Sequence, residues 1–163
     1  MKKKVLLALT GALLLTSSSA FAVCQGEECK IVQKVAERYL SGLPDHAHHI
    51  TADEVYKRIQ SGDKNFVIVD VRMPKAEKYD KGHLPGAIYI GWREIAKPEN
   101  LAKLPKDKDI IIYCDTGHEQ MRVASILRML GYNVYTMRFG MMSWKVLPPT
   151  SRALDAISGS IKN

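Results

Sequence analysis

Residues 110–132 read IIIYCDTGHEQMRVASILRMLGY and join a strand pattern to a helix pattern through a cysteine. Residues 110–113 form an unbroken apolar run rich in β-branched side chains, which predicts a buried strand. Over residues 120–130 apolar positions recur with helical spacing, and Gly131 then predicts a C-cap. Cys114 stands where the strand stops, with a short polar loop between it and the helix.

The same alternation of strand and helix continues on both sides of this stretch. Thr51 and Glu54 form a capping box that predicts a helix up to Gly62, and residues 98–108 predict a loop with a short helical turn. Further unbroken apolar runs predict strands at residues 65–71, 87–90 and 133–137. The sequence therefore predicts an α/β fold, a single domain whose central, mainly parallel sheet carries helices on both faces.

The first 22 residues have the features of a secretory signal peptide. Lysines at positions 2–4 precede an apolar run over residues 5–15, which is too short to span a bilayer, and residues 20–22 (AFA) match a cleavage site. A lipoprotein acylated at Cys24 is the alternative, and Val23 disfavours it because a small residue normally stands there. We expect export to the periplasm, with no membrane attachment after cleavage.

Charge and spacing define the rest of the organisation. Loss of the three lysines lowers the formal net charge from +7 to +4, and no basic stretch is interleaved with aromatics, so we expect no nucleic acid partner. Three histidines in residues 45–49 (DHAHH) lack a nearby cysteine or glutamate, so a linker is favoured over a metal site. The predicted parts are a signal peptide (1–22), an N-terminal helix and linker (23–47), the α/β domain (48–147) and a C-terminal helix or tail (148–163).

The three cysteines divide into a close pair and a single residue. Cys24 and Cys29 would form a local disulfide in an oxidising compartment, or remain two free thiols near the new N-terminus. Cys114 is left over. Since it follows a parallel strand and precedes a helix, backbone N–H groups of the loop can surround its sulfur and favour a thiolate. An inert cysteine that ends a core strand is the alternative.

Residues from about 48 to 145 resemble the rhodanese (sulfurtransferase) family. IVDVR followed by YDKGHLPGAIYI is similar to the first signature of the family, IIIYCDTGHEQ to its active-site loop, and FGMMSWK to its final signature. The matching residues are Asp70, Arg72, Gly82, His83, Pro85, Gly86, Ala87, Cys114, Gly117, Gly140 and Trp144.

The resemblance implies that Cys114 takes sulfur from a small donor, holds it as a persulfide and passes it to a thiol or cyanide. The backbone amides of the loop would stabilise the charge on the bound sulfur; the loop residues are Asp115, Thr116, Gly117, His118, Glu119 and Gln120. Asp70 and Arg72 would support the loop through a buried salt bridge, and His83 would stabilise a turn. We expect no metal and no cofactor.

The loop also departs from the pattern of thiosulfate-using rhodaneses, which carry a basic residue there. Asp115 and Glu119 are acidic and oppose both a thiolate and a dianionic donor, so the sequence predicts weak activity with thiosulfate. The loop is also too short, and lacks the arginine, for a phosphatase-like relative. Two other functions stay open: a binding module for a partner protein, and a thiol redox protein that uses all three cysteines.

Overall fold

The structure, a computed structural model, describes residues 26–45 and 48–146. Its single sheet has five parallel strands in the order β1-β5-β4-β2-β3, which confirms the predicted α/β class. The strands are β1 (His49–Ile50), β2 (Phe66–Asp70), β3 (Ile88–Tyr89), β4 (Asp109–Tyr113) and β5 (Val134–Met137). The helices are α1 (Glu27–Ser41), α2 (Ala52–Gln60), α3 (Pro98–Leu101), α4 (His118–Met129), α5 (Gly140–Lys145) and the 3-10 turn η1 (Lys75–Glu77).

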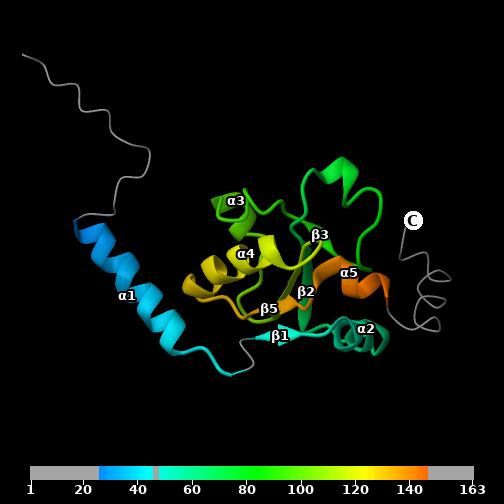
Figure 1. Cartoon of the computed structure of the whole chain (residues 1–163), viewed down its shortest axis with the longest axis horizontal. Coiled ribbons are helices and arrows are strands. Elements are labelled where there is room, and N and C mark those ends of the chain that lie inside the picture. Colours follow the sequence, from blue (N-terminus) through cyan, green and yellow to red (C-terminus); the bar gives the residue numbers. More distant parts are fainter. Residues whose placement is uncertain (1–25, 46–47, 147–163) are drawn as a thin grey trace, which may run out of the picture. The chain divides into compact units, whose positions relative to one another are not determined.

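The central strand β4 sorts its side chains between two hydrophobic clusters. Ile111 and Tyr113 join the cluster that α2 and α5 cover, whereas Ile110, Ile112 and Cys114 join the cluster that α4 covers. Both faces of the sheet are therefore buried, which explains why the strands read as continuous apolar runs. Figure 1 shows α4 along one side of the sheet and α2 with α5 near its other side. The prediction of helices on both faces is confirmed.

Most predicted elements are present, with shifted ends. The capping box of Thr51 and Glu54 starts α2, and α3 is the short helical turn expected in residues 98–108. The helix predicted over 120–130 begins two residues earlier, at His118, because Gly117 adopts a left-handed conformation and ends the loop there.

Three elements were missed, and the first is the 3-10 turn η1, which is only three residues long. His49, the last of the histidines predicted to lie in a linker, belongs to the edge strand β1, whose two residues are too few to give a periodic pattern. α5 follows Phe139 and was recognised only as part of a signature, since six residues are too few for an amphipathic pattern.

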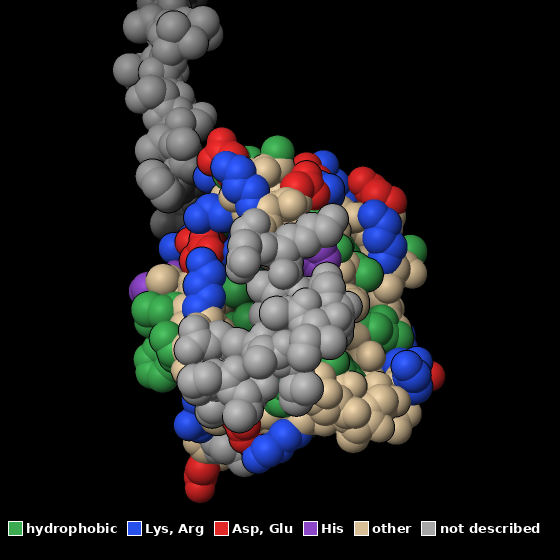
Figure 2. All heavy atoms as spheres, turned by 90° about the vertical axis from the view of Figure 1, so that its right-hand side faces the viewer, with side chains coloured by type: hydrophobic (Ala, Val, Ile, Leu, Met, Phe, Trp, Pro, Cys, Tyr) green, Lys and Arg blue, Asp and Glu red, His purple; other side chains and the backbone are tan. Residues whose placement is uncertain are grey.

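The N-terminal half of α1 belongs to a different compact unit from the sheet, whose unit begins at Val35. None of the helices in the described ranges is long and apolar enough to cross a membrane. On the face seen in Figure 2, the Lys and Arg side chains are interspersed with Asp and Glu side chains.

Some predictions concern residues outside those described. The signal peptide, Cys24 and the C-terminal helix fall there, and the domain limits at 47/48 and 147/148 stay predictions. Cys29 is disulfide-bonded and Cys114 is a free thiol. The pairing of Cys29 with Cys24 therefore stays a prediction as well.

Candidate active site

Cys114 lies immediately beyond the carboxyl end of β4, at the edge of the sheet where ligands of open α/β folds bind. Its Sγ accepts a hydrogen bond from the backbone N–H of Gly117 at 3.0 Å. Gly117 has a backbone φ of 115°, which residues other than glycine rarely adopt. The loop thus turns an N–H group toward the sulfur, as the sequence predicted.

Cys114 lines a small polar cleft at the ends of three strands. The cleft has a volume of about 240 Å³, and its lining residues are Arg72, Met73, Trp92, Cys114, Asp115, Thr116 and Glu119. All but Glu119, which lies in α4, follow the ends of β2, β3 and β4, and these strands are neighbours in the sheet. Only 1% of the surface of Cys114 is exposed. The cysteine therefore packs into the core on one side and borders a polar cleft on the other.

The sequence predicted that the loop would lower the pKa of the Cys114 thiol below its ordinary value, and for the thiol without bound sulfur this prediction is wrong. Burial raises the pKa of Cys114, and this outweighs the lowering by hydrogen bonds from the backbone N–H groups of Gln120, Gly117 and Thr116. A hydrogen bond with the side chain of Glu119 raises the pKa further. At neutral pH the resting sulfur is therefore mainly a protonated thiol.

The two loop carboxylates differ in their partners. Asp115 forms ion pairs with Lys78 at 2.9 Å and with Arg72 at 3.7 Å, so its charge is largely compensated. Glu119 forms no ion pair among the described residues. Of the two acidic residues that the sequence identified, Glu119 is therefore the one that opposes ionisation of the sulfur.

Asp70 and Arg72 form a buried network behind the loop. The Nε of Arg72 donates to both carboxylate oxygens of Asp70 at 3.0 Å, and the Tyr113 hydroxyl donates to Oδ2 at 2.7 Å. The hydroxyl in turn accepts from the backbone N–H of Leu84 at 3.1 Å. The predicted buried salt bridge is present, and Tyr113 is a third member that the sequence did not identify. Arg72 also borders the cleft, where it faces Asp115.

His83 takes the turn-stabilising place that the sequence assigned to it. Its Nδ1 lies 2.9 Å from the carbonyl oxygen of Tyr79, and the two rings stack at 3.9 Å.

Gln120 braces the loop with its side chain. Its Oε1 accepts from the backbone N–H of Cys114 at 2.9 Å, and its Nε2 donates to the carbonyl of Met137 at 2.6 Å. The sequence assigned only the backbone amide of Gln120 to the site. The missed signal was a polar residue at a position where α4 faces the core.

The first turn of α5 packs against the backbone of the Cys114 loop. The backbone N–H of Met141 donates to the carbonyl of Cys114 at 2.7 Å, and that of Met142 donates to Asp115 at 3.1 Å. A Cβ at Gly140 would collide with the carbonyl group of Cys114. The glycine of the final signature thus permits close contact between α5 and the loop.

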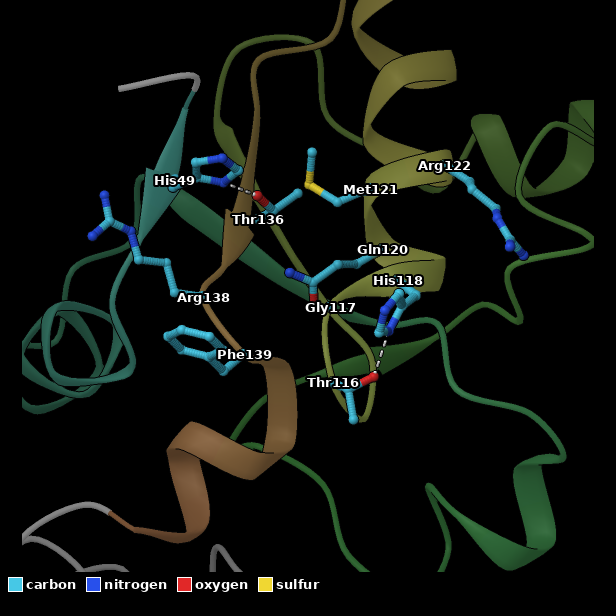
Figure 3. Close-up of a pocket in the computed structure, with 10 residues that line it drawn as sticks. All are labelled: His49, Thr116, Gly117, His118, Gln120, Met121, Arg122, Thr136, Arg138 and Phe139. Atoms are coloured by element: carbon cyan, nitrogen blue, oxygen red, sulfur yellow. Dashed lines mark hydrogen bonds between the residues drawn. The ribbon is translucent and has the colours of Figure 1, made fainter. Parts of the chain in front are cut away.

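A larger cavity of about 660 Å³ also borders the loop (Figure 3). Thr116 borders both spaces, but Cys114 does not line this one. The residues in Figure 3 are His49, Thr116, Gly117, His118, Gln120, Met121, Arg122, Thr136, Arg138 and Phe139. His118 lies 2.9 Å from the hydroxyl of Thr116 and faces this cavity, so the six loop residues divide between two spaces. Among the described residues, no group of His, Cys, Asp and Glu is arranged to hold a metal ion.

Known proteins resemble this chain in sequence and in fold. A transcriptional regulator of the helix-turn-helix type from Mycobacterium tuberculosis is 34% identical over 128 residues, 71% of this chain and 53% of the regulator. A putative sulfurtransferase from Bacillus subtilis is 31% identical over 83 residues, 51% of this chain and 77% of that protein. The chain thus spans about half the length of the first of these relatives.

The fold has solved counterparts. The crystal structure of a rhodanese-like domain protein from Staphylococcus aureus superposes with a TM-score of 0.53 and 30% identity, over 59% of this chain and 89% of that chain. The family of rhodanese-like domains matches residues 51–147, which is more than half of the chain and includes both Asp70 and the Cys114 loop. The chain therefore belongs to the rhodanese-like domain family.

Proposed function

We propose that this protein is a sulfurtransferase that moves sulfane sulfur through a persulfide on Cys114. The observation that carries the proposal is the Sγ of Cys114, which borders a cleft and accepts the N–H of Gly117 at 3.0 Å. Family membership and the relatives named as sulfurtransferases support the same chemistry.

The reaction needs two displacements at sulfur. The Cys114 thiolate attacks the outer sulfur of a donor, a sulfur–sulfur bond forms, and the donor leaves with the electron pair of the bond that breaks. An acceptor thiolate or cyanide then attacks the outer sulfur of the persulfide, and the Cys114 thiolate leaves. The products are an acceptor persulfide or thiocyanate, so no external oxidant or reductant is required.

Groups of the protein around the cleft affect how stable the negatively charged forms of the Cys114 sulfur are. The Gly117 N–H stabilises the negative charge on Cys114, and the guanidinium of Arg72, which is paired with Asp70 and Asp115, lines the cleft. Burial raises the pKa of the thiol, so the reactive thiolate is a minor species at neutral pH. A persulfide is a stronger acid than a thiol, and the loop amides favour its charged form once sulfur is bound.

Thiosulfate should be a poor donor. It carries two negative charges, and Glu119 leaves an uncompensated carboxylate at the wall of the cleft. An organic persulfide carries only one negative charge on its terminal sulfur, so it should be a better donor. We further propose that the protein acts after export to the periplasm, on the basis of the N-terminal lysines, the apolar run and the AFA site.

Intact mass spectrometry after incubation with polysulfide tests the proposal. The full chain should gain one sulfur atom that cyanide removes, and Cys114→Ser should gain none. A mixed disulfide or a disulfide of Cys114 in place of the added sulfur would support the thiol redox function.

A binding module is the second candidate function. The regulator of Mycobacterium tuberculosis that resembles this chain shows that such similarity extends to a protein not named as an enzyme. Failure of wild-type protein to take up sulfur from polysulfide, with native fold retained, would favour this function over sulfur transfer.

A further inference from the structure

A second groove adjoins the Cys114 cleft and shares Trp92 with it. The groove has a volume of about 380 Å³, and its lining residues are Trp92, Arg93, Ile95, Ala96, Arg122, Val123 and Ile126. Trp92 also lines the cleft of the cysteine, so one aromatic side chain separates the two spaces. A molecule bound in the groove therefore lies next to the space where sulfur is exchanged.

Two arginines approach Trp92 from different elements. The Cζ of Arg93 lies 4.6 Å from the centre of a Trp92 ring, and the Cζ of Arg122, on α4, lies 5.7 Å from it. Figure 3 shows Arg122 extending from α4 away from His49 and Phe139, which agrees with its position over Trp92. A guanidinium held by the face of an aromatic ring keeps N–H groups available for a carboxylate.

Neither arginine forms an ion pair with another described residue, although nine such pairs are present in the described ranges. Arg138, in the larger cavity, differs in this respect. Hydrogen bonds from Thr51 lower the pKa of Glu54, and the charge of Arg138 lowers it further, so Arg138 has a carboxylate nearby. The groove beside Trp92 thus holds two arginines that have no ion-pair partner among the described residues.

The rest of the groove is apolar. Ile95 and Val123 are buried members of the core at its base, and Ile126 is exposed along α4. The groove therefore combines hydrocarbon contact with two cationic groups, an arrangement complementary to a molecule with an apolar body and an anionic end.

We propose that this groove binds the body of the sulfur acceptor, a small organic thiol with an apolar chain and a carboxylate. The carboxylate pairs with Arg93 and Arg122, the chain lies on Ile95, Val123 and Ile126, and the thiolate passes Trp92 to reach the persulfide of Cys114. This assignment rests on the proposed sulfur transfer and adds to it the class of acceptor.

Acceptor pairs that differ only in charge test the assignment. Protein loaded with one sulfur atom is mixed with mercaptohexanoate or with its primary amide, and the rate of sulfur loss is followed by intact mass. The carboxylate should discharge Cys114 faster than the amide at equal thiolate concentration. Arg122→Gln should reduce this preference about tenfold, because a charge-assisted hydrogen bond is lost, and the double variant with Arg93→Gln should abolish it.

Lys64→Gln provides a matched control, since it removes the same unit of charge from the opposite end of β2 and should keep the preference. Loading of each variant with sulfur from polysulfide shows that its fold and its cysteine are intact. Equal rates for carboxylate and amide in the wild-type protein, or a preference that survives the double variant, would overturn the assignment.

A separate binding experiment distinguishes a failure of this inference from a failure of the proposed function. Hexanoate, which has no thiol, should change the tryptophan fluorescence of the unloaded protein in a saturable way, about tenfold more weakly in Arg122→Gln. Saturable binding without sulfur uptake by Cys114 would refute sulfur transfer and retain the anion groove. Sulfur uptake without hexanoate binding would refute the groove and retain sulfur transfer.

Discussion

The two spaces that border the 114–120 loop differ in the residues that line them. The smaller cleft contains Cys114 and is walled by the charged residues Arg72, Asp115 and Glu119, whereas the larger cavity contains no cysteine. Thr116 borders both. The size of a cavity therefore does not single out the space that borders Cys114, the residue of the proposed sulfur transfer. Cys114 and the three charged side chains border the smaller space, and of these charged residues only Arg72 is buried.

The largest expected effect comes from Cys114→Ser, which should abolish sulfur uptake because serine cannot form a persulfide. Met121→Leu changes a residue that lines only the larger cavity, and it should leave uptake unchanged. Intact mass after polysulfide treatment measures both. Uptake by the serine variant equal to that of the wild type would place the reactive sulfur elsewhere.

Asp70→Asn should destabilise the protein by about 3–5 kcal/mol, since it leaves the buried Arg72 without its counter-charge. Asp109→Asn is the matched change in a pair whose side chains are about a quarter exposed, and it should cost about 1 kcal/mol. Urea unfolding measures both free energies. Equal losses of unfolding free energy in the two variants would show that burial does not make the Asp70–Arg72 pair more important for stability than the partly exposed pair.

Gly140→Ala should destabilise the protein by about 2–4 kcal/mol, because a positive φ and a collision with the Cys114 carbonyl add together. Gly131→Ala has a similar φ of 84° but open space around its Cβ, so it should cost only about 1 kcal/mol. Unfolding in urea gives the two values, and sulfur uptake shows whether the loop has moved. Identical costs would contradict the close contact between α5 and the loop.

The smallest expected effect is on pH dependence. Burial raises the pKa of Cys114, so the rate of sulfur uptake should rise with pH through and beyond the range of an ordinary cysteine. Glu119→Gln removes a carboxylate that raises this pKa, so the profile should move to lower pH, by less than about one unit. Uptake rates measured across a pH series give the profile.

Asp115→Asn is the comparison for this shift. The charge of Asp115 is compensated by Lys78 and Arg72, so the profile should move less than in the Glu119 variant. A larger shift in the Asp115 variant would reverse the assignment of the opposing carboxylate.

The sequence alone was sufficient for the elements with long, continuous patterns. The apolar runs of β2 and β4 and the spacing in α4 predicted a parallel sheet, and the order of strand, cysteine and helix placed Cys114 at the carboxyl edge. β1 and α5 were missed because two and six residues are too few to form a recognisable period. The resemblance carried by the signatures supplied the chemistry, which periodicity cannot supply.

Only the tertiary structure decided the electrostatics of the site. The sequence does not distinguish the two acidic residues Asp115 and Glu119. In the structure Lys78 and Arg72, from the segment after β2, form ion pairs with Asp115 and none with Glu119. The acidity of Cys114 was likewise predicted in the wrong direction. Local hydrogen bonds from the loop can be read from the sequence, whereas burial depends on packing between distant segments, and burial is the stronger influence here.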